Sequence, residues 1–300
     1  MLYEPRRRTT EVRSPKSARI LVFTTCYNER DNIGPLIDDI ATELPLADIL
    51  IVDDNSPDGT WDVIRQKTTK YKQLTAVQRP RKMGIGGAHK YALFFAMREG
   101  YQTLITMDAD FSHDPKHLTE LLRAHAKNRF VTGSRYCKGG KSDYGGYRNV
   151  VSRIGNLAAR WALGLDLHDF TTFYRVFDVA SLRHVPLRRV IAEGYSYGVQ
   201  LVFYLGRAGI DLREVPIHFP DRTRGPSKIP RLQILFSAID LFKLAAVRFF
   251  RCGYFEADLF VDDACAKCGD HVLAMKTRRE HATESELTYT CLRCGTCCKL

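Results

Sequence analysis

The sequence lacks three features that would each assign it to a familiar class of protein. Residues 1–19 contain basic side chains but no apolar core, so they do not predict a secretory signal peptide. The glycine-containing segment 82–88 has neither the GK(S/T) ending of a phosphate-binding loop nor the GxGxxG of a dinucleotide fold. A membrane span needs roughly 20 apolar residues, but the best candidate, residues 232–250, has Asp240 and Lys243 at its centre. That pattern favours an amphipathic helix lying on a membrane or on the domain.

Acidic residues are scarce relative to basic ones. The chain has 45 Lys and Arg against 34 Asp and Glu, a formal net charge of +11. Such an excess suits an anionic partner, whether a nucleotide, a phospholipid surface or nucleic acid. We expect residues 1–17 to form a disordered basic arm. Because aromatic residues are not interleaved with this arm, nucleic acid is the least favoured partner.

Cysteine is sparse along most of the chain and concentrated at its end. Six of the nine cysteines lie after residue 260. With no export signal expected, a reducing compartment is favoured, and these cysteines become metal ligands rather than disulfides. Two CxxC knuckles predict a zinc-ribbon-like module over residues 260–300, with redox thiols as the alternative. The predicted ligands of its structural Zn²⁺ are Cys265, Cys268, Cys291 and Cys294.

Strand-like apolar runs alternate with helical patterns through the first half of the chain. The runs begin at Ala18, Ala47, Leu74 and Thr103, and a helical stretch follows each of the first three. This alternation predicts an α/β fold with a mostly parallel sheet, helices on both faces, and ligands at the carboxyl ends of the strands. The polar residues expected at those ends are Tyr27, Asp53, Asp54, Asp108 and Asp110.

Residues 103–115, TLITMDADFSHDP, are the most informative segment of the sequence. An apolar run stops at Asp108, and a second carboxylate follows at Asp110. Two close acids at a strand end indicate a divalent cation such as Mg²⁺ or Mn²⁺, which commonly brings a substrate diphosphate with it. The alternative is that Asp110 only caps a helix that starts near Pro115.

Six motifs in order resemble the family-2 glycosyltransferases, and most of all the dolichol-phosphate mannosyltransferases and their polyprenyl-phosphate relatives. They are TTCYNERDNI, IVDDNSPDGT, RKMGIGGA, MDADFSHDP, GSRYCKGG and EVPIHFPDRTRGPSK. The resemblance spans about residues 18–250. It implies a GT-A glycosyltransferase domain over residues 18–230, followed by an interfacial helix at 231–252. It also implies a metal between carboxylate and diphosphate, with inversion at the sugar carbon.

The resemblance also implies where the nucleotide sugar lies. Asp54 would accept hydrogen bonds from the base or ribose, although it could instead be a turn-forming acid. Arg224 and Lys228 would close over the diphosphate from a mobile loop. Asp108 and Asp110 would bind the metal. The full nucleotide-sugar set is Tyr27, Glu29, Asp54, Lys82, Asp108, Ala109, Arg224 and Lys228.

On the acceptor side, the resemblance implies that Arg135, Arg148 and Ser152 hold a lipid phosphate. A phosphate monoester is largely ionised near neutral pH, so it could attack without a general base. Arg135 would then act in catalysis with Asp108 and Asp110 by orienting the phosphate. The alternative is that the two arginines are ordinary surface charges.

Two positions depart from the family pattern D-x-T-S-G-F-R. The chain reads DFTTFYR from Asp169 to Arg175, with Phe173 in the place of glycine, and Gln200 stands where an acid is common. Phenylalanine cannot copy a close backbone approach or a positive φ. We therefore expect the acceptor to be less closely defined than the donor, and the helix around Gln200 to contact Arg175 differently.

The sequence therefore predicts a glycosyltransferase that moves a hexose, most simply mannose from GDP-mannose, onto polyprenyl or dolichyl phosphate. One alternative is a UDP-sugar donor with a different acceptor, and another is an inactive domain that acts as a binding module. We expect a peripheral protein on the cytoplasmic face of a membrane. The helix at 232–250, the basic arm or a membrane-anchoring partner protein would attach it.

Overall fold

The computed structural model describes residues 19–220, except 144, 191, 193 and 195, together with residues 233–250 and four short C-terminal strands. The main strands are β1 (Ile20–Cys26), β2 (Asp48–Asp53), β3 (Leu74–Gln78), β4 (Thr103–Asp108), β5 (Phe130–Ser134), β7 (Arg175–Asp178) and β8 (Leu212–Pro216). The α-helices are α1 (Arg30–Glu43), α2 (Thr60–Lys70), α3 (Ile85–Arg98), α4 (Leu118–His125), α5 (Gly146–Leu163), α6 (Ser196–Arg207) and α7 (Gln233–Phe250). Short elements are β6 (Lys141–Ser142), β9 (His218–Phe219) and the 3-10 helices η1 (Pro115–His117), η2 (Ser181–His184) and η3 (Leu187–Arg189).

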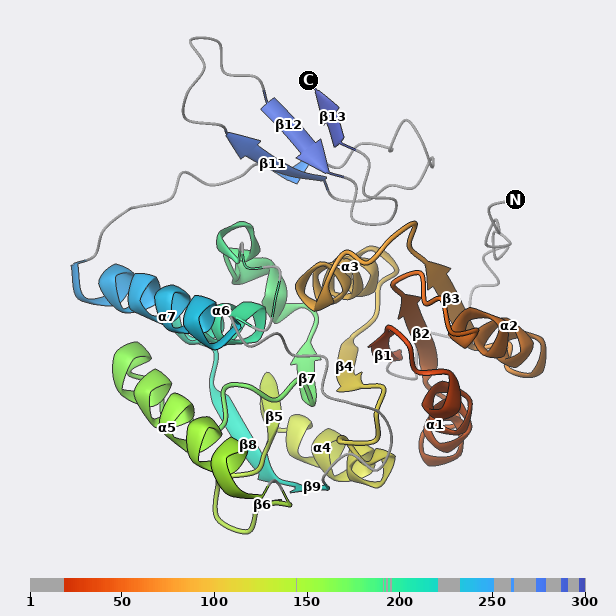
Figure 1. The fold of residues 1–300 in the computed structure, drawn as a ribbon, viewed down its shortest axis with the longest axis horizontal. Coiled ribbons are helices and arrows are strands. Elements are labelled where there is room, and N and C mark those ends of the chain that lie inside the picture. The colour runs from red at the N-terminus through yellow and green to blue at the C-terminus, as the bar shows by residue number, and fades with distance from the viewer. Residues whose placement is uncertain are drawn as a thin grey trace.

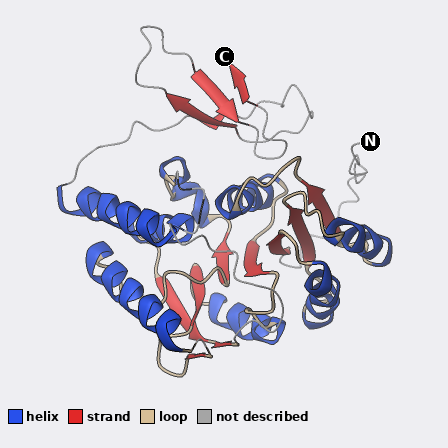
Figure 2. Ribbon diagram, in the orientation of Figure 1, coloured by secondary structure: helices blue, strands red, loops and turns tan. Residues whose placement is uncertain are grey.

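The main sheet is mostly parallel, as the alternating pattern predicts. Its seven strands have the order β3-β2-β1-β4-β7-β5-β8 (Figure 1). All neighbours run parallel except β7, which is antiparallel to both β4 and β5. Helices pack on both faces of this sheet, drawn in blue around the red strands in Figure 2.

Alternating side chains of the central strands supply two separate cores, because successive residues of a strand point to opposite faces. In β1, Leu21 and Phe23 pack with α3 and α6, whereas Val22 and Cys26 pack with α1 and α4. Strand β2 divides in the same way. Since both faces are covered, the interior strands are apolar over nearly their whole length. The polar residues are displaced to the strand ends.

Gly59 allows a sharp turn between the end of β2 and the start of α2. A turn from Ser56 to Gly59 connects β2 to α2, and Gly59 has a φ of +88°. Side chains with a Cβ rarely adopt this conformation. Asp58 Oδ1 accepts the backbone N–H of Thr60 at 3.0 Å, which satisfies one of the first amides of α2.

Helices α5 and α7 pack against each other beside the second half of the sheet (Figure 1). Arg248 of α7 donates to the carbonyl oxygens of Trp161 and Ala162, at 2.7 and 3.1 Å. A cation at the carboxyl end of a helix stabilises the unpaired carbonyls there. No helix within the described ranges combines the length and apolar content that a membrane span requires.

Four short strands near the C-terminus form a separate antiparallel sheet. They are β10 (Phe260–Val261), β11 (Ala274–Arg278), β12 (Leu287–Thr290) and β13 (Cys297–Lys299), paired in that order. The division of the chain into arm, transferase domain, interfacial helix and zinc module stays a prediction.

Candidate active site

The ends of three parallel strands place the predicted polar residues along one edge of the sheet. Strand β1 lies between β2 and β4, with Cys26 paired to Asp53 and Thr25 paired to Asp108. The residues that follow these strands therefore leave the sheet side by side. In open α/β sheets, ligands bind beyond the carboxyl ends of the strands, so this edge is the candidate active site.

The acid pair lies on a tight turn after β4. Asp110 Oδ1 accepts the backbone N–H of Ser112 at 3.1 Å, and Phe111 between them has a φ of +60°. Asp108 and Asp110 are both partly exposed, whereas Ala109 between them is buried. The carboxylates are thus accessible at the strand end. The competing interpretation of Asp110 as a helix cap does not apply, because Asp114 caps η1 by accepting from Lys116 N–H at 3.0 Å.

A buried histidine, His113, hydrogen-bonds to the backbone of this turn. His113 Nδ1 accepts the backbone N–H of Asp108 at 2.9 Å. Burial lowers the pKa of His113 to about 3, so the ring is neutral at physiological pH. A neutral ring can accept at one nitrogen and donate at the other. The turn therefore places two carboxylates next to a neutral imidazole.

The donor set of the turn fits a hard divalent cation. Mg²⁺ is usually bound by one or two carboxylates together with substrate phosphates and water, and Asp108 and Asp110 supply two accessible carboxylates. Within the described residues, no three His, Cys, Asp or Glu side chains cluster to hold a metal by themselves. Ser112 is buried, and its hydroxyl has no hydrogen-bond partner in that part of the chain. A cation here would rely on the diphosphate and water for its remaining ligands.

Asp54 anchors the start of α3. Its Oδ2 accepts the backbone N–H groups of Met83 and Gly84, at 3.1 and 2.9 Å, and its Oδ1 pairs with Arg79. Burial raises the pKa of Asp54, against the lowering effect of the Arg79 charge and the two amides. Gly84 has a φ of +84°, which favours glycine at this helix start. The predicted contact of Asp54 with base or ribose stays a prediction.

Two of the predicted nucleotide-side residues contact each other. Lys82 Nζ lies 4.2 Å from the ring centroid of Tyr27, a cation–π contact. Lys82 is exposed and Tyr27 is partly exposed. Glu29 is nearby in sequence, and its Oε2 accepts from Asn32 Nδ2 at 2.7 Å. The carboxyl ends of β1 and β3 thus present an aromatic ring and a cation together.

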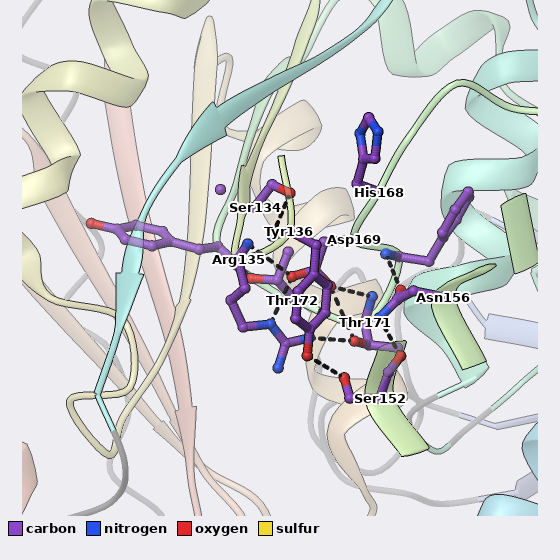
Figure 3. Close-up of polar contacts among 12 residues, drawn as sticks. Ser134, Arg135, Tyr136, Ser152, Asn156, His168, Asp169, Thr171 and Thr172 are labelled. Carbon is purple, nitrogen blue, oxygen red and sulfur yellow. Dashed lines mark hydrogen bonds and ion pairs between the residues drawn. The ribbon is translucent and has the colours of Figure 1, made fainter. Parts of the chain in front are cut away.

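Arg135, which follows β5, is held in a buried carboxylate fork. Its Nε and Nη2 donate to the two oxygens of Asp169, at 2.7 and 2.8 Å, and Nη2 also donates to Thr171 Oγ1 at 2.6 Å (Figure 3). Burial acts to raise the pKa of Asp169, but the Arg135 charge and hydrogen bonds outweigh it and lower that pKa. Arg135 is only 6% exposed. It is a fixed cation, not an ordinary surface arginine.

Helix α5 contacts this fork through polar side chains (Figure 3). Tyr136 Oη donates to Ser152 Oγ at 2.7 Å, and the backbone N–H of Phe170 donates to Asn156 Oδ1 at 2.7 Å. Arg153 and Arg135 both lie within about 5 Å of the Tyr136 ring centroid, at 4.9 and 5.0 Å. Two of the predicted acceptor residues, Arg135 and Ser152, are therefore joined through one tyrosine.

The remaining predicted site residues fall outside the description. Arg148 lies in the first turn of α5, but its side chain is not among the described ones. Arg224 and Lys228 lie outside the described residues, and so do the zinc candidates Cys265, Cys268, Cys291 and Cys294.

Comparison with known proteins decides the family. The family described as Glycosyl transferase family 2 matches residues 21–185, which include β1 to β5, the acid pair and Arg135. The chain belongs to glycosyl transferase family 2. It is therefore a glycosyltransferase, as its ordered motifs predict.

Two curated family 2 relatives share 35% identity with this chain. An undecaprenyl-phosphate mannosyltransferase of Micrococcus luteus matches over 212 residues, 70% of this chain and 87% of that protein. A polyprenol monophosphomannose synthase of Mycolicibacterium smegmatis matches over 214 residues, 70% of this chain and 81% of that protein.

Solved structures confirm the GT-A fold of this family 2 chain. Glucosyl-3-phosphoglycerate synthase of Mycobacterium tuberculosis in complex with phosphoglyceric acid has a TM-score of 0.57 at 18% identity, covering 82% of this chain and 84% of that one. The same enzyme with Mn²⁺, uridine diphosphate and glucosyl-3-phosphoglycerate has a TM-score of 0.55 at 20% identity, with the same coverage. At such identity the likeness shows the fold alone.

Phe173, where this family 2 glycosyltransferase departs from the family pattern, packs in the core. Phe173 is 2% exposed, and its ring lies 4.6 Å from that of His89. Its backbone is not among the positive-φ residues of the described chain. A Cβ on Gly198 would come within 3.2 Å of the Phe173 ring, so glycine in α6 provides the space. Phe173 therefore needs no glycine-like backbone and faces away from the acceptor fork.

The second departure, Gln200, also has a structural role. Gln200 Oε1 accepts the backbone N–H of Ala192 at 3.0 Å. Arg175 is contacted instead by the carbonyl oxygens of Gly198 and Phe170, both at 2.9 Å. Burial lowers the pKa of Arg175 to about 10, and the guanidinium stays charged at neutral pH because that value is still well above 7. An amide at position 200 thus serves a backbone contact, not the arginine.

Sequence reasoning did not select several residues that build the site. Asp169 was predicted only as the first residue of the DFTTFYR motif. A buried carboxylate nevertheless requires a cationic partner. His113 follows the acid pair by three residues, and Tyr136 follows Arg135 directly. The closeness of His113 to Asp110 and of Tyr136 to Arg135 was the sequence feature that could have identified them. Their contacts depend on residues far along the chain.

Proposed function

We propose that this protein is a metal-dependent inverting glycosyltransferase that moves mannose from GDP-mannose onto a polyprenyl or dolichyl phosphate. The observation that carries this proposal is the meeting, at one sheet edge, of the accessible acid pair Asp108 and Asp110 with the buried cation Arg135. The names of the two relatives at 35% identity support mannose and a polyprenyl phosphate as substrates.

The residues of the chain would divide the reaction between two sides. Asp108 and Asp110 would hold Mg²⁺ or Mn²⁺, which when bound stabilises the negative charge of the departing nucleoside diphosphate. Tyr27 and Lys82 border the nucleotide, and Arg224 and Lys228 would close over its phosphates. Such closure excludes water, which would otherwise compete for the sugar.

On the other side, Arg135 orients the attacking phosphate. Arg148 and Ser152 would contact the same group from α5. Because a phosphate monoester is already largely ionised at neutral pH, the protein need not remove a proton. Its task is to align a phosphate oxygen with the sugar carbon. Attack opposite the leaving diphosphate inverts the configuration at that carbon.

The exposed face of α5 supports a membrane-bound acceptor. Five apolar residues at helical spacing of three and four are 54–75% exposed on this helix, namely Tyr147, Val150, Ile154, Leu157 and Trp161. Helix α7 adds Ile239, Phe242 and Phe249, and the Trp161 and Phe249 rings are 6.3 Å apart. We call these eight side chains the α5–α7 apolar face. Exposed apolar faces of this kind mark membrane or protein contacts.

A phospholipid bilayer is the occupant that we propose for the α5–α7 apolar face. The opposite side of α5 carries Ser152 and Asn156, which contact Tyr136 and the backbone of Phe170, the neighbours of Arg135 and Asp169. A lipid phosphate at the bilayer surface would therefore be next to the site. The net charge of +11 favours an anionic surface. We propose peripheral attachment on the cytoplasmic face, helped by the basic arm or a membrane-anchoring partner protein. The zinc module, with its four cysteines, is proposed as a docking or stabilising element.

A donor and acceptor screen tests the reaction. Purified protein is incubated with GDP-mannose or UDP-hexoses, with a short polyprenyl phosphate, and with Mg²⁺, Mn²⁺ or EDTA. We expect mannosyl lipid from GDP-mannose with either metal and none with EDTA. Turnover of UDP-hexoses alone would contradict the donor, and turnover of no donor would contradict the proposed reaction.

Vesicle binding tests the α5–α7 apolar face. Leu157→Glu should reduce co-sedimentation with anionic phospholipid vesicles about tenfold, because one carboxylate on an apolar face opposes insertion. Leu46→Glu is the matched control, since Leu46 is 92% exposed on a different part of the surface. Equal binding by both variants would rule out this face as the docking surface.

A further inference from the structure

His113 lies between two segments that are far apart in sequence. On one side its Nδ1 accepts the backbone N–H of Asp108, at 2.9 Å. On the other side its Nε2 lies 3.1 Å from Thr172 Oγ1. The first contact belongs to the acid-pair turn. The second belongs to the segment 169–174, which carries the Asp169 partner of Arg135 and is called here the acceptor segment.

These two contacts define which nitrogen of His113 carries the hydrogen. A backbone N–H can only donate, so Nδ1 must be the unprotonated nitrogen. The hydrogen of the neutral ring is then on Nε2, where it donates to Thr172 Oγ1. That oxygen also accepts the backbone N–H of Tyr174 at 3.2 Å. Hydrogen-bond donation therefore runs in one direction, from the backbone N–H of Asp108 through the imidazole to Thr172 Oγ1 in the acceptor segment.

Aromatic packing fixes the orientation of the imidazole. His113 stacks on Tyr174 with ring centroids 4.9 Å apart and meets Phe219 edge-on at 5.5 Å. Tyr174 Oη donates to the carbonyl oxygen of Asp114 at 2.9 Å, which joins the same two segments a second time. The Arg135 guanidinium lies 4.9 Å from the centroid of the Phe219 ring. One aromatic side chain thus contacts both His113 and the acceptor cation.

The acceptor segment in turn determines where Arg135 points. Asp169 receives Arg135 through both oxygens, and Thr171 Oγ1 receives a third bond. Thr172 is the next residue along the chain. A shift of the acceptor segment relative to the acid-pair turn would therefore move Arg135 relative to Asp108. Small misplacements of reacting groups are costly, about 100-fold in rate for 1 Å.

We propose that His113 is a positioning residue that fixes the distance between the acid-pair turn and the acceptor segment, and so between the departing diphosphate and the attacking phosphate. This inference rests on the proposed function for the identity of those two groups. The bridge itself, Asp108 N–H to His113 to Thr172, is a property of the chain. A histidine whose only role was to fill the core would not need hydrogen bonds to both sides of the site.

The matched pair Thr172→Val and Thr172→Ser tests the bridge. Valine keeps the branched shape of this buried side chain but removes the hydroxyl, whereas serine keeps the hydroxyl. We expect Thr172→Val to lower kcat about 10- to 100-fold, the usual cost of losing a residue that orients metal ligands, with the KM values of donor and acceptor changed less than about threefold. Thr172→Ser should stay within about threefold of the native kcat.

His113→Asn completes a double-mutant cycle. Asparagine can still accept from Asp108 N–H but is too short to reach Thr172, so we expect the same loss of kcat as in Thr172→Val. Because both changes break one bridge, the double variant should lose no more than the worse single variant. A kcat within twofold of native for Thr172→Val, equal losses for valine and serine, or additive losses in the double variant would each overturn the proposal.

A measurement on the unmodified protein covers the case in which variants do not fold. The ¹⁵N shifts of the His113 ring should show a protonated Nε2 and an unprotonated Nδ1 at pH 7. An Nδ1–H tautomer or an imidazolium would overturn the bridge. If the native protein transfers no sugar, the proposed function is contradicted. The ¹⁵N shifts of His113 and the affinity for Mn²⁺ with GDP then still test the bridge independently. Thr172→Val should weaken that Mn²⁺ affinity about tenfold, and unchanged affinity would count against the bridge.

Discussion

The two sides of the site, which we propose bind the donor and the acceptor, differ in how their charged side chains are held. On the donor side, Asp108 and Asp110 are partly exposed at the tip of a turn, and the neutral His113 lies beneath them. On the acceptor side, Arg135 is nearly buried, and the buried carboxylate of Asp169 binds it through two hydrogen bonds. The acceptor cation is thus oriented before any ligand arrives.

The difference follows from the ligands that each side would receive. A buried charge requires a partner within the protein, and Asp169 provides it for Arg135. Two partly exposed carboxylates at a strand end suit a hard divalent cation that arrives together with a diphosphate. The donor side therefore depends on added charge, whereas the acceptor side depends on packing. Substitutions should separate these two kinds of dependence.

The largest effect is expected from Asp110→Asn on the donor side. Loss of one metal-binding carboxylate should lower the transfer rate about 1000-fold, because metal stabilisation of the leaving group is worth several kcal/mol. The urea midpoint should change little, since Asp110 is partly exposed. Transfer kinetics and calorimetric titration of Mn²⁺ with GDP measure the two effects. Asp39→Asn, at another exposed acid, is the matched control, and equal activity of the two variants would exclude a metal role for Asp110.

Asp169→Asn should act mainly through stability. It leaves the buried Arg135 without a charged partner, and breaking a buried pair costs about 3–5 kcal/mol. We expect a lower urea midpoint together with a loss of transfer activity, whereas Mn²⁺ affinity should be retained in the folded fraction. A variant as stable as the native protein would contradict the account of the acceptor side as a packed charge pair.

Lowering the pH should remove the same stabilisation without a substitution. The pKa of Asp169 is lower in the folded chain than its unfolded value of about 4. Its contribution to stability is therefore present above pH 4 and is lost as the pH falls through the folded pKa. The stability difference between the native protein and Asp169→Asn should shrink below pH 4 in urea titrations at several pH values. A difference that stays constant from pH 6 to pH 3 would rule out this linkage.

Phe173→Leu should have a small effect that is confined to stability. Phe173 packs in the core against His89, and a hydrophobic replacement of this kind costs about 1 kcal/mol. Because Phe173 faces away from the Arg135 fork, the KM for polyprenyl phosphate should stay unchanged. Thermal denaturation and acceptor kinetics measure the two parts. A change in acceptor preference would restore Phe173 as a residue that selects the acceptor.

Lys82→Ala should have the smallest effect. An exposed cation–π contact such as that of Lys82 with Tyr27 is worth about 0.5–1 kcal/mol. We expect the KM for the nucleotide sugar to rise about threefold, with the KM for the acceptor unchanged. Lys82→Arg keeps the cation and should remain near the native value. A larger change in acceptor KM than in donor KM would show that Lys82 belongs to the other side.

The parts of the fold that depend on local pattern could be predicted from the sequence. Strand-like runs from Ala18, Ala47, Leu74 and Thr103 correspond to β1 to β4, because strands buried on both faces are apolar along their length. The acid pair was predicted at the end of β4, because an apolar run stops at Asp108 and a second carboxylate follows at Asp110. Antiparallel β7 was not predicted. Its direction depends on its pairing with β4 and β5 across about 70 and 45 residues of chain, as seen for Ile105 and Val131 with Val176.

The contacts that join the two sides could not be predicted in the same way. The contact of Asp54 with base or ribose stays a prediction, but the hydrogen bonds that its Oδ2 accepts from Met83 and Gly84, about 30 residues further along the chain, were not predicted. Phe173 was expected to weaken the acceptor claim because glycine usually occupies its place. The space for it comes from Gly198, which no pattern around position 173 reveals. Such compensation between distant residues requires the folded chain.

On the proposed membrane, helix α5 would separate the bilayer from the phosphate site. One side carries five exposed apolar residues, and on the other Ser152 and Asn156 contact Tyr136 and the backbone of Phe170, next to Arg135 and Asp169. A helix with its side chains is about 10 Å across, so a chain resting on a bilayer would hold its phosphate site about that far above the lipid tails. The number of isoprene units in the tail would not alter this height. Enzymes built in this way should accept lipids of many lengths at similar rates.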